Sequence, residues 1–430
     1  MNKMYKHTYK KILPILLVIS IIISLIFSFF MWIDPFQLGY FHKKQEIVNN
    51  SGIVSRSINE IFKPTQVVET DNNGNMKVYT NLQTNLTSEI VNDIKSWKMS
   101  NLRQISHNNK QTYQSILQQK NTIQLYYPDN IGNDIFNKTY HQHLMMSSHV
   151  TFSKIVFSQK KSNCIYLLND NKYQVYKVSL NKEQTKNISK ILKNHKTYEI
   201  SPIIKKSGVL FVSKEPFSIP QYSYLVSNQT VNTVLNSLFS SSGNINTHHN
   251  GQYDYYYSGN KHVSVNNSNN NVNFENNESN GYKKNNLNHN LMSSYLSLNN
   301  KGLFQGVVHY FGNNNNGKKI DYRYFIYNIP IFDSNYGNIN WVNMGNNQKI
   351  SFSLTDLQVP LRIENNSVLP SSQTILDSLI NKGIKLNNIN QLIVGYKWIT
   401  KNNKKQIITL KPQWFVMINH KWHTYKDLIK

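Results

Sequence analysis

The sequence predicts an α+β fold, in which a single N-terminal transmembrane helix precedes a multi-domain ectodomain of helices packed on antiparallel sheets. Three observations support this prediction. The first is one uncharged apolar run of 22 residues, at positions 12–33. The second is a series of short segments rich in β-branched and aromatic residues, separated by Asn- and Gly-rich turns. The third is a set of segments with the apolar period of a helix, placed between those strands.

The apolar run at 12–33 has the length and the flanks of a membrane-spanning helix. At about 1.5 Å per residue it extends roughly 33 Å, which matches a hydrocarbon core of about 30 Å. It continues into an aromatic stretch at 29–32 with no small-residue cleavage site, so it does not resemble a cleaved signal peptide. Positive charge before a first span predicts a cytoplasmic tail, here residues 1–11, and an extracellular C-terminal part. The charges are those of Lys3, Lys6, Lys10 and Lys11.

Three serines recur every fourth residue within this run, at Ser20, Ser24 and Ser28. Residues at this spacing share one face of a helix. Small residues on one face allow two membrane helices to approach closely, and their hydroxyls can hydrogen-bond across the contact. Serines in membrane helices also bond back to their own backbone carbonyls, so an anchor without a pairing face is the alternative.

Turns and composition divide the rest of the chain into three parts. We expect an N-terminal α/β domain at 34–200, a middle helix-on-sheet domain at 201–290 and a C-terminal helix-on-sheet domain at 291–430. Helices are predicted at 87–97, 181–194, 228–241, 290–300 and 371–383. Strands are predicted at 59–70, 76–81, 122–128, 152–158, 163–169, 173–180, 208–217, 220–227, 252–258, 261–267, 304–312, 320–332, 391–400 and 406–425.

Two of the predicted helices have a clear apolar face. In the helix at 87–97, Thr87 is expected to cap the first turn, and the apolar face consists of Ile90, Val91, Ile94 and Trp97. In the helix at 371–383, Gly383 is expected to end the helix. Its apolar face consists of Ile375, Leu376, Leu379 and Ile380.

The similarity of two segments indicates a duplicated module, consisting of one helix packed on an antiparallel sheet. The stretch at 234–239, VLNSLF, resembles ILDSLI at 375–380, and each lies in a predicted helix followed by a long aromatic hairpin. The match is short, so a chance similarity remains the alternative. In the first hairpin, Gly259 and Asn260 form a two-residue turn of the kind that tight hairpins prefer.

The composition is strongly basic, with a formal net charge of +25. Such a charge favours anionic partners, namely lipid head groups or wall polymers, and nucleic acid is a poor candidate outside a cell. Lysine and asparagine are abundant throughout, so compositional drift is the simpler reading, with weak surface attraction as a by-product. The single cysteine, Cys164, cannot form an internal disulfide and is expected to be a small buried residue.

No motif of a known reaction is found in the sequence, which lacks a nucleophile elbow, a Walker loop, a zinc-protease helix and a dinucleotide fingerprint. His141, His143 and His149 could in principle hold zinc, but no carboxylate at a suitable spacing accompanies them. Solvated or partly buried histidines are the better reading. With only 22 scattered acidic residues, a glycosidase-like pair has no clear candidate. We therefore expect no enzyme, cofactor or metal site.

Several segments, taken in order, resemble the YycH family. The C-terminal pattern LIVGYKW at 392–398 and ITLKPQWFVMINHKWHTY at 408–425 resembles the end of that family. The single N-terminal span with its aromatic exit is also similar. Further matching pieces are IFKPTQVV at 61–68, FSKIVF at 152–157, QVYKVSL at 174–180, IPQYSYLV at 219–226, YRYFIYNIPIF at 322–332 and LPSSQTILDSLI at 369–380.

The resemblance implies a non-enzymatic regulator in the cell membrane. YycH proteins are extracytoplasmic regulators of the WalK (YycG) sensor histidine kinase, which controls cell-wall metabolism in low-GC Gram-positive bacteria. The implied partners are a WalK-like kinase and a YycI-like single-span co-regulator. The serine face at Ser20, Ser24 and Ser28 would then supply helix contacts in the membrane.

Two other functions compete with this reading. One is an anchored surface module that binds anionic wall polymer, favoured by the basic charge. The other is a wall-active hydrolase, disfavoured because no constellation of reactive groups is found. The Asn-rich tract at 266–290 and the turn NNNNG at 313–317 depart from the family pattern, so contacts made by those loops are not implied by the resemblance.

Overall fold

The computed structural model describes residues 17–24, 47–48, 54–79, 86–160, 163–181, 186–193, 195–239, 244–277, 286–314, 316–333, 335–400 and 406–430. Ile47–Leu82 and Leu86–Lys430 form one compact unit, and Met1–Glu46 with Gln83–Asn85 form another. In the second of these, residues 17–24 are helical. Most of the predicted span at 12–33 therefore lies outside the described residues. No helix within the described ranges is long and apolar enough to cross a membrane.

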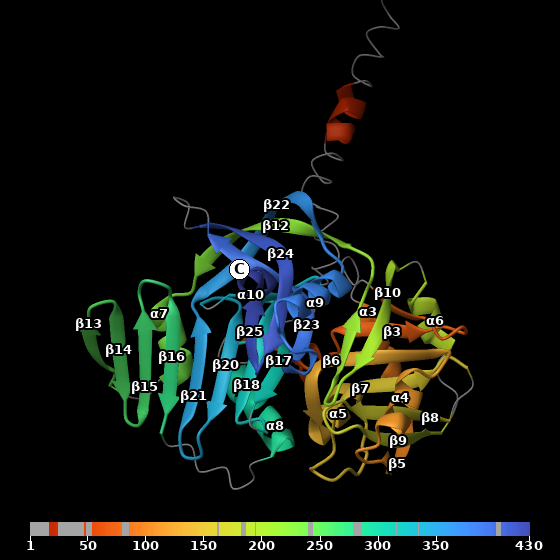
Figure 1. Ribbon diagram of the computed structural model, residues 1–430. Coiled ribbons are helices and arrows are strands. Elements are labelled where there is room, and N and C mark those ends of the chain that lie inside the picture. The colour runs from red at the N-terminus through yellow and green to blue at the C-terminus, as the bar shows by residue number, and fades with distance from the viewer. Residues whose placement is uncertain are drawn as a thin grey trace, which may run out of the picture. The chain divides into compact units, whose positions relative to one another are not determined.

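The first part of the compact unit is a nine-stranded antiparallel sheet, coloured orange to yellow-green in Figure 1. Its strand order is β11-β10-β4-β3-β6-β7-β8-β9-β5. The strands are β3 (Gln66–Thr70), β4 (Met76–Tyr79), β5 (Met99–Ser106), β6 (Thr122–Gly132), β7 (Thr151–Ser158), β8 (Cys164–Asn169), β9 (Gln174–Leu180), β10 (Thr197–Ile204) and β11 (Val209–Val212). A separate pair joins β1 (Ile47–Val48) to β2 (Val54–Ser55).

Helices cover both faces of this sheet because its central strands are apolar on both sides. The helices α3 (Leu86–Ile94), α5 (Asn133–Tyr140) and α6 (Lys186–Ile191) share a core with Ile155 and Phe157 of β7. The intervening Val156 faces the other way and packs with α4 (Lys110–Leu117). This alternation follows from the two-residue period of a strand. The short helix α2 (Ile58–Ile61) contributes Ile61 to the larger core.

The second part is a 14-stranded sheet, coloured green to blue in Figure 1. Twelve strands follow the order β13-β14-β15-β16-β21-β20-β18-β19-β23-β24-β12-β22, while β17 pairs with β18 and β25 with β24. The strands are β12 (Phe217–Asn228), β13 (Asn246–Asn250), β14 (Tyr253–Ser258), β15 (Lys261–Asn266), β16 (Asn271–Asn276), β17 (Val308–Asn314), β18 (Lys319–Ile326), β19 (Ile329–Phe332), β20 (Asn338–Asn343), β21 (Gln348–Ser353), β22 (Thr355–Leu369), β23 (Ile389–Thr400), β24 (Ile407–Ile418) and β25 (Lys421–Thr424).

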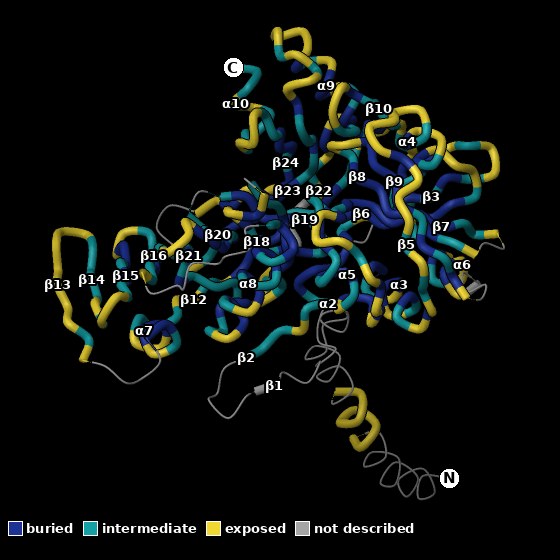
Figure 2. The backbone as a smooth tube through the Cα atoms, turned by 90° about the horizontal axis from the view of Figure 1, so that it is seen from below, coloured by how far each residue is buried: buried dark blue, intermediate teal, exposed yellow. Residues whose placement is uncertain are grey.

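Two helix groups pack against this sheet. The helices α7 (Val231–Phe239) and α8 (Leu287–Asn300) join the core that also contains α3 and α5. The helix α9 (Ser372–Asn381) has its own core with β12, β23 and β24, and α10 (Tyr425–Ile429) packs beside it. A short 3-10 helix, η1 (Leu386–Asn388), leads into β23. Figure 2 shows buried residues concentrated on the inner strands and exposed residues along β13.

The two halves of the large sheet meet at a parallel pair, β19 with β23, where Ile331 lies opposite Tyr396. Gly395 permits this junction, because a Cβ atom there would lie 2.4 Å from Cδ2 of Phe332 and 2.9 Å from Cδ2 of Phe415. The rings of Phe332 and Phe415 stack with centroids 4.0 Å apart. Any side chain at residue 395 would push this buried stack apart.

The prediction of an α+β fold of helices on antiparallel sheets is confirmed, and so is the two-residue turn at Gly259–Asn260. Three details were wrong. The helix α3 begins at Leu86, so Thr87 lies buried in its first turn and does not cap it. Ile380 of α9 is 44% exposed, whereas its three predicted companions are buried. Cys164 is half-buried at the start of β8.

The strands of the predicted middle and C-terminal domains share one sheet. The strand β16, before residue 290, pairs with β21, and β12 pairs with β22 and β24. The likeness between 234–239 and 375–380 corresponds to α7 and α9, and both helices bury an apolar face against strands of this sheet.

Candidate functional site

The predicted helix-pairing residues fall only partly within the described chain. Ser20 and Ser24 lie one turn apart in the helical segment 17–24, where the side chains are exposed. Ser28 lies outside the described residues. The apolar residues around the two serines, Leu17 to Ile23, are 47–62% exposed. The pairing face at Ser20, Ser24 and Ser28 stays a prediction.

The three histidines considered as zinc ligands lie on exposed backbone after α5. His141 ends that helix in the left-handed conformation, and His143 and His149 follow in an irregular segment. Among the described residues, no group of three or more His, Cys, Asp or Glu side chains is placed to hold a metal ion.

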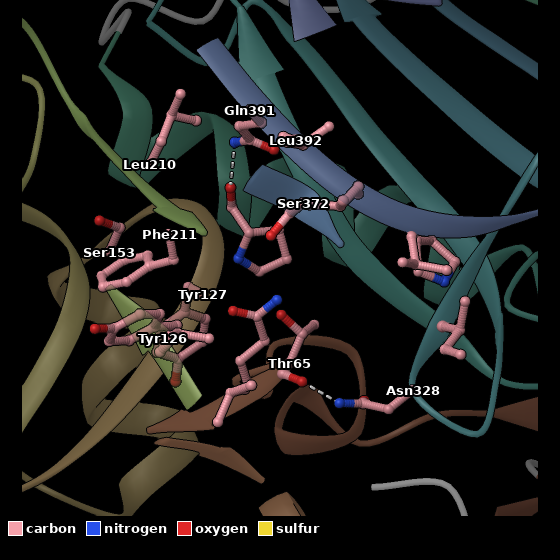
Figure 3. Close-up of a pocket in the computed structure, with 18 of the residues that line it drawn as sticks. Thr65, Tyr126, Tyr127, Ser153, Leu210, Phe211, Asn328, Ser372, Gln391 and Leu392 are labelled. Atoms are coloured by element: carbon pink, nitrogen blue, oxygen red, sulfur yellow. Dashed lines mark hydrogen bonds between the residues drawn. The ribbon is translucent and has the colours of Figure 1, made fainter. Parts of the chain in front are cut away.

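Within the compact unit, a cavity of about 350 Å³ lies between the two sheets (Figure 3). One wall comes from β6, β10 and β11 of the nine-stranded sheet. The opposite wall comes from β12, β19 and β23 of the 14-stranded sheet. Its volume is within the range of roughly 300–1,000 Å³ that is typical of small-molecule sites.

Three irregularities of the backbone shape this cavity. On β6 the pairing with β7 jumps from Tyr126↔Lys154 to Ile131↔Phe152, so residues 127–130 bulge out of the ladder. On β23 the register slips at Asn390. The turn from β18 to β19 places Tyr327 and Asn328 at positive φ, 46° and 65°. Bulges and left-handed residues redirect the chain, and residues of all three irregularities line the cavity.

Hydrogen bonds cross from one wall to the other around the rim. The Gln391 side-chain nitrogen donates to the carbonyl oxygen of Pro128 at 2.9 Å, as drawn in Figure 3. Asn328 donates from its side chain to the carbonyl oxygen of Thr65, and the Lys205 ammonium donates to that of Ile389 at 2.5 Å. Burial lowers the pKa of Lys205. These contacts hold the two sheets together around a space that they do not fill.

The wall from the nine-stranded sheet contains a pair of aromatic rings and an ion pair. The rings of Tyr126 and Phe211 lie 5.1 Å apart, and the ammonium of Lys154 lies 4.9 Å from the centre of the Tyr126 ring. Lys154 forms an ion pair with Asp170, which also accepts a hydrogen bond of 2.6 Å from the hydroxyl of Tyr113. The positive charge of Lys154 is therefore balanced within the wall.

Asp129, on the bulge of β6, is a second acidic group at the cavity. One carboxylate oxygen accepts hydrogen bonds from the backbone and the side-chain nitrogens of Asn313, both at 2.9 Å. The other accepts the backbone N–H of Asn130 at 2.7 Å. Burial raises the pKa of Asp129 to about 6, although these hydrogen bonds oppose the shift.

Another aromatic cluster lines the part of the cavity nearest β12. The ring of Phe217 lies 4.7 Å from that of Tyr198 and 5.6 Å from that of Trp414. Trp414 donates its indole N–H to the carbonyl oxygen of Pro370. Together the walls combine ring faces, amide groups and carboxylates, a composition that can bind an amphipathic molecule.

Sequence reasoning did not find the cavity. Its lining comes from segments up to about 350 residues apart, since Thr65 and Trp414 both contribute. The available local signal was the stretch YYPDN at 126–130, where proline and two turn-forming residues interrupt an apolar strand.

Comparisons with known proteins cover nearly the whole chain. The family model "YycH protein, N-terminal domain" matches residues 10–197, and "YycH protein, C-terminal domain" matches residues 207–429. The crystal structure of YycH from Bacillus subtilis is similar, with a TM-score of 0.69 and 18% sequence identity over 87% of this chain and 98% of that chain. At 18% sequence identity, this similarity shows a shared fold and nothing about function.

A second solved structure, an uncharacterized protein from Eubacterium rectale, has a TM-score of 0.30 and 8% identity over 50% of this chain and 86% of that chain, values too low to indicate a shared fold. Among curated proteins no relative matches the chain. The two family models span the described sheets and extend to residue 10, so the chain belongs to the YycH family.

Proposed function

We propose that this chain is a non-enzymatic, membrane-anchored regulator of a WalK-like sensor histidine kinase. The observation that carries the proposal is the match of two consecutive YycH family models to residues 10–197 and 207–429. The likeness of the fold to YycH from Bacillus subtilis, over 98% of that chain, is consistent with it. A regulator needs contacts with its kinase and does not need a reaction of its own.

The proposal includes a topology. Residues 1–11 form a cytoplasmic tail, residues 12–33 cross the cell membrane once, and the two-sheet unit lies outside the cell. The uncharged run of 22 residues and the four lysines before it support this arrangement.

The proposed contact with the kinase lies in the membrane, on the face of Ser20, Ser24 and Ser28. The regular spacing and the small size of these residues support helix pairing. A YycI-like single-span protein is the proposed co-regulator, and its own helix would occupy the same bilayer. The ectodomain positions the helix or transmits an external signal to it.

Co-purification from native membranes tests the kinase contact. Tagged chain would be crosslinked in cells of its own host, solubilised in mild detergent and captured, and the captured proteins identified by mass spectrometry. The expected result is enrichment of a sensor kinase and of a YycI-like protein, relative to an unrelated single-span protein carrying the same tag. Capture of neither protein would contradict the proposal.

The net charge of +25 favours a second candidate function, binding of anionic wall polymer. Teichoic acid would then bind the chain with an affinity that falls steeply between low and physiological salt. Strong binding together with no kinase in the crosslinked complex would favour this second function over the first.

A further inference from the structure

We propose that the cavity between the two sheets binds an uncharged molecule with an apolar body. This site goes beyond the regulator function and would exist whether or not the chain contacts a kinase. Three features of the lining support the proposal. Apolar side chains remain accessible on both walls, the main polar groups already have partners within the protein, and the charges around the cavity balance.

Both walls present apolar side chains that are only half-buried. Such side chains keep surface that a ligand can touch, unlike the fully buried residues behind them. A molecule with apolar surface would remove them from water, with a gain in free energy that grows with the area covered. The nine-stranded sheet contributes Val78, Ile200 and Phe211, and the 14-stranded sheet contributes Phe217, Ile329 and Ile393.

These six side chains lie at the edges of four hydrophobic clusters. Those on β4 and β10 border the cluster around Tyr126, and Phe211 borders both that cluster and the one that contains α4. Those on β12 and β19 border the core of α9, and Ile393 borders the cluster that contains the stack of Phe332 and Phe415. The four clusters meet at the cavity without merging. An apolar body placed there would contact all of them.

The main polar groups of the lining are already hydrogen-bonded within the protein. Asp129 accepts three hydrogen bonds, and Asp170 accepts one in addition to its ion pair. The side-chain nitrogens of Gln391 and Asn328 donate to carbonyl oxygens of the opposite wall. A polar ligand would have to replace these bonds, so they give it little advantage over an apolar one. Within the described part of the chain, three lining oxygens lack a partner but are fully buried below the cavity surface, those of Asn130, Asn328 and Asn390.

The charges at and behind the lining cancel. Asp129 and Asp170 are the acidic residues of the lining, and Lys154 is its basic residue. Behind the lining, a carboxylate accepts the hydroxyl of Tyr79, one ammonium lies over the ring of Tyr198, and another bonds to the backbone at the start of β23. These three groups belong to Glu69, Lys196 and Lys205. Three negative and three positive charges attract an ion of neither sign, and burying an unpaired ion is costly. The cavity therefore favours an uncharged ligand.

The size and the rings of the cavity suit a flat body. Its volume of about 350 Å³ has room for at least about a dozen non-hydrogen atoms, since a water molecule occupies about 30 Å³. Phe211 beside Tyr126 offers ring surface on one wall, and Phe217 beside Trp414 offers it on the other. Figure 3 shows Phe211 and Tyr126 together on their side of the space. A naphthalene body has the required size and shape.

The test compares three probes with the same naphthalene body and different head groups: 2-naphthylmethanol, 2-naphthylmethylamine and 2-naphthoate. Binding to the full chain in nanodiscs would be measured by ligand-observed NMR. The alcohol is expected to bind at least about tenfold more tightly than either ion, because an ion loses its hydration without gaining an opposite charge. The amine and the carboxylate are expected to bind with similar affinity, because the charges around the cavity balance.

Two substitutions fill the cavity from opposite walls, Ile200→Trp and Ile393→Trp. Each is expected to weaken binding of the alcohol by about tenfold, because the indole occupies the space of the ligand. Leu296→Trp is the matched control, since Leu296 is 45% exposed on α8 and does not line the cavity. Comparison in identical nanodiscs cancels the partition of the probe into lipid. Thermal unfolding would establish that the variants fold.

Two outcomes would overturn the site: tighter binding of either ion than of the alcohol, and cavity-filling variants that bind the alcohol as well as Leu296→Trp does. If those variants do not fold, hydrogen exchange of the parent decides. The bound alcohol is expected to slow exchange of amides in both β10 and β23, and unchanged exchange at saturating alcohol would refute the proposal. None of these measurements involves the kinase, so failure here and failure of the regulator function are distinguishable.

Discussion

Asp129 is the residue whose environment most clearly links structure to pH. Its pKa is raised from 3.8 to about 6 because burial disfavours the charged form. The folded protein therefore holds a proton that the unfolded chain has released between about pH 4 and pH 6. The free energy of unfolding loses the contribution of this group as the pH rises through that window. A pKa raised from 3.8 to about 6 corresponds to about 3 kcal/mol.

Asp129→Asn is expected to remove this pH-dependent loss. The variant has no proton to release, so its stability relative to the parent should rise by on the order of 2–3 kcal/mol between pH 4 and pH 7. Denaturant unfolding at several pH values measures the difference. Using the difference cancels the contributions of all other titrating groups. Parallel stability curves for parent and variant would show that Asp129 is not buried as described.

Gly395 lies where two aromatic rings leave no room for a side chain. A methyl group at this position would overlap the stacked rings of Phe332 and Phe415. Gly395→Ala is therefore expected to lower the free energy of unfolding by about 1–3 kcal/mol. Gly312→Ala is the matched control, because its Cβ would lie 3.7 Å from the nearest oxygen of Asp129, an ordinary contact. Equal stability of the two variants would contradict the close approach at β19–β23.

At the scale of elements, α9 tests the helix-on-sheet packing. Leu376 is buried in the core that α9 shares with β12, β23 and β24. Leu376→Ala is expected to cost about 2–5 kcal/mol. Ile380→Ala on the same helix removes a side chain that is 44% exposed, so it should cost much less. Chemical denaturation of both variants checks the contrast, and a similar loss for each would mean that α9 packs differently.

The example of Ile380 shows what helical periodicity can and cannot predict. Successive residues are rotated by about 100° around a helix, so Ile375, Leu379, Leu376 and Ile380 span an arc of roughly 140°. Periodicity correctly identified this arc as the apolar side of α9. The width of the buried strip depends on the sheet beneath it, which the helix sequence does not contain. Ile380 lies at the edge of the arc and outside that strip.

The cavity could not be predicted, for a related physical reason. Its shape depends on where β6 leaves its ladder with β7 and where β23 slips by one residue. Strand register is decided by the pairing partners, and these lie far away in the sequence. The long strand β22 was not predicted from the sequence either. Its sequence contains Pro360 and the pair Asn365–Asn366, which read as breakers of a strand.

At the scale of the whole molecule, the proposed topology leads to a test of processing. The mature chain should keep residues 1–33, because the apolar run lacks a cleavage site. Mass spectrometry of the N-terminal peptide in membranes, together with protease access to a C-terminal tag on intact protoplasts, would check this. Mature chains that begin beyond residue 30, or a protected C-terminal tag, would contradict the topology.

The serine face offers the most direct test of how such a molecule could act on a kinase. Allosteric couplings of about 1–3 kcal/mol change an equilibrium 5–150-fold. Interhelical hydrogen bonds in membranes average roughly 0.6 kcal/mol, and close packing adds to them. Contacts from Ser20, Ser24 and Ser28 together therefore reach the required range without any contribution from the ectodomain.

Replacing Ser20, Ser24 and Ser28 together with leucine keeps the run apolar but fills the face where a second helix would pack. The variant is expected to reach the membrane at the parental level, lose most of its co-purification with the kinase and fail to restore expression of a kinase-controlled reporter in a deletion strain. Replacing Ile19, Ile23 and Phe27 with leucine is the matched control. These residues have the same spacing on a face rotated by about 100°, and that variant should behave like the parent. If the serine variant binds and regulates like the parent, the working contact lies on another face of the helix or in the two-sheet unit.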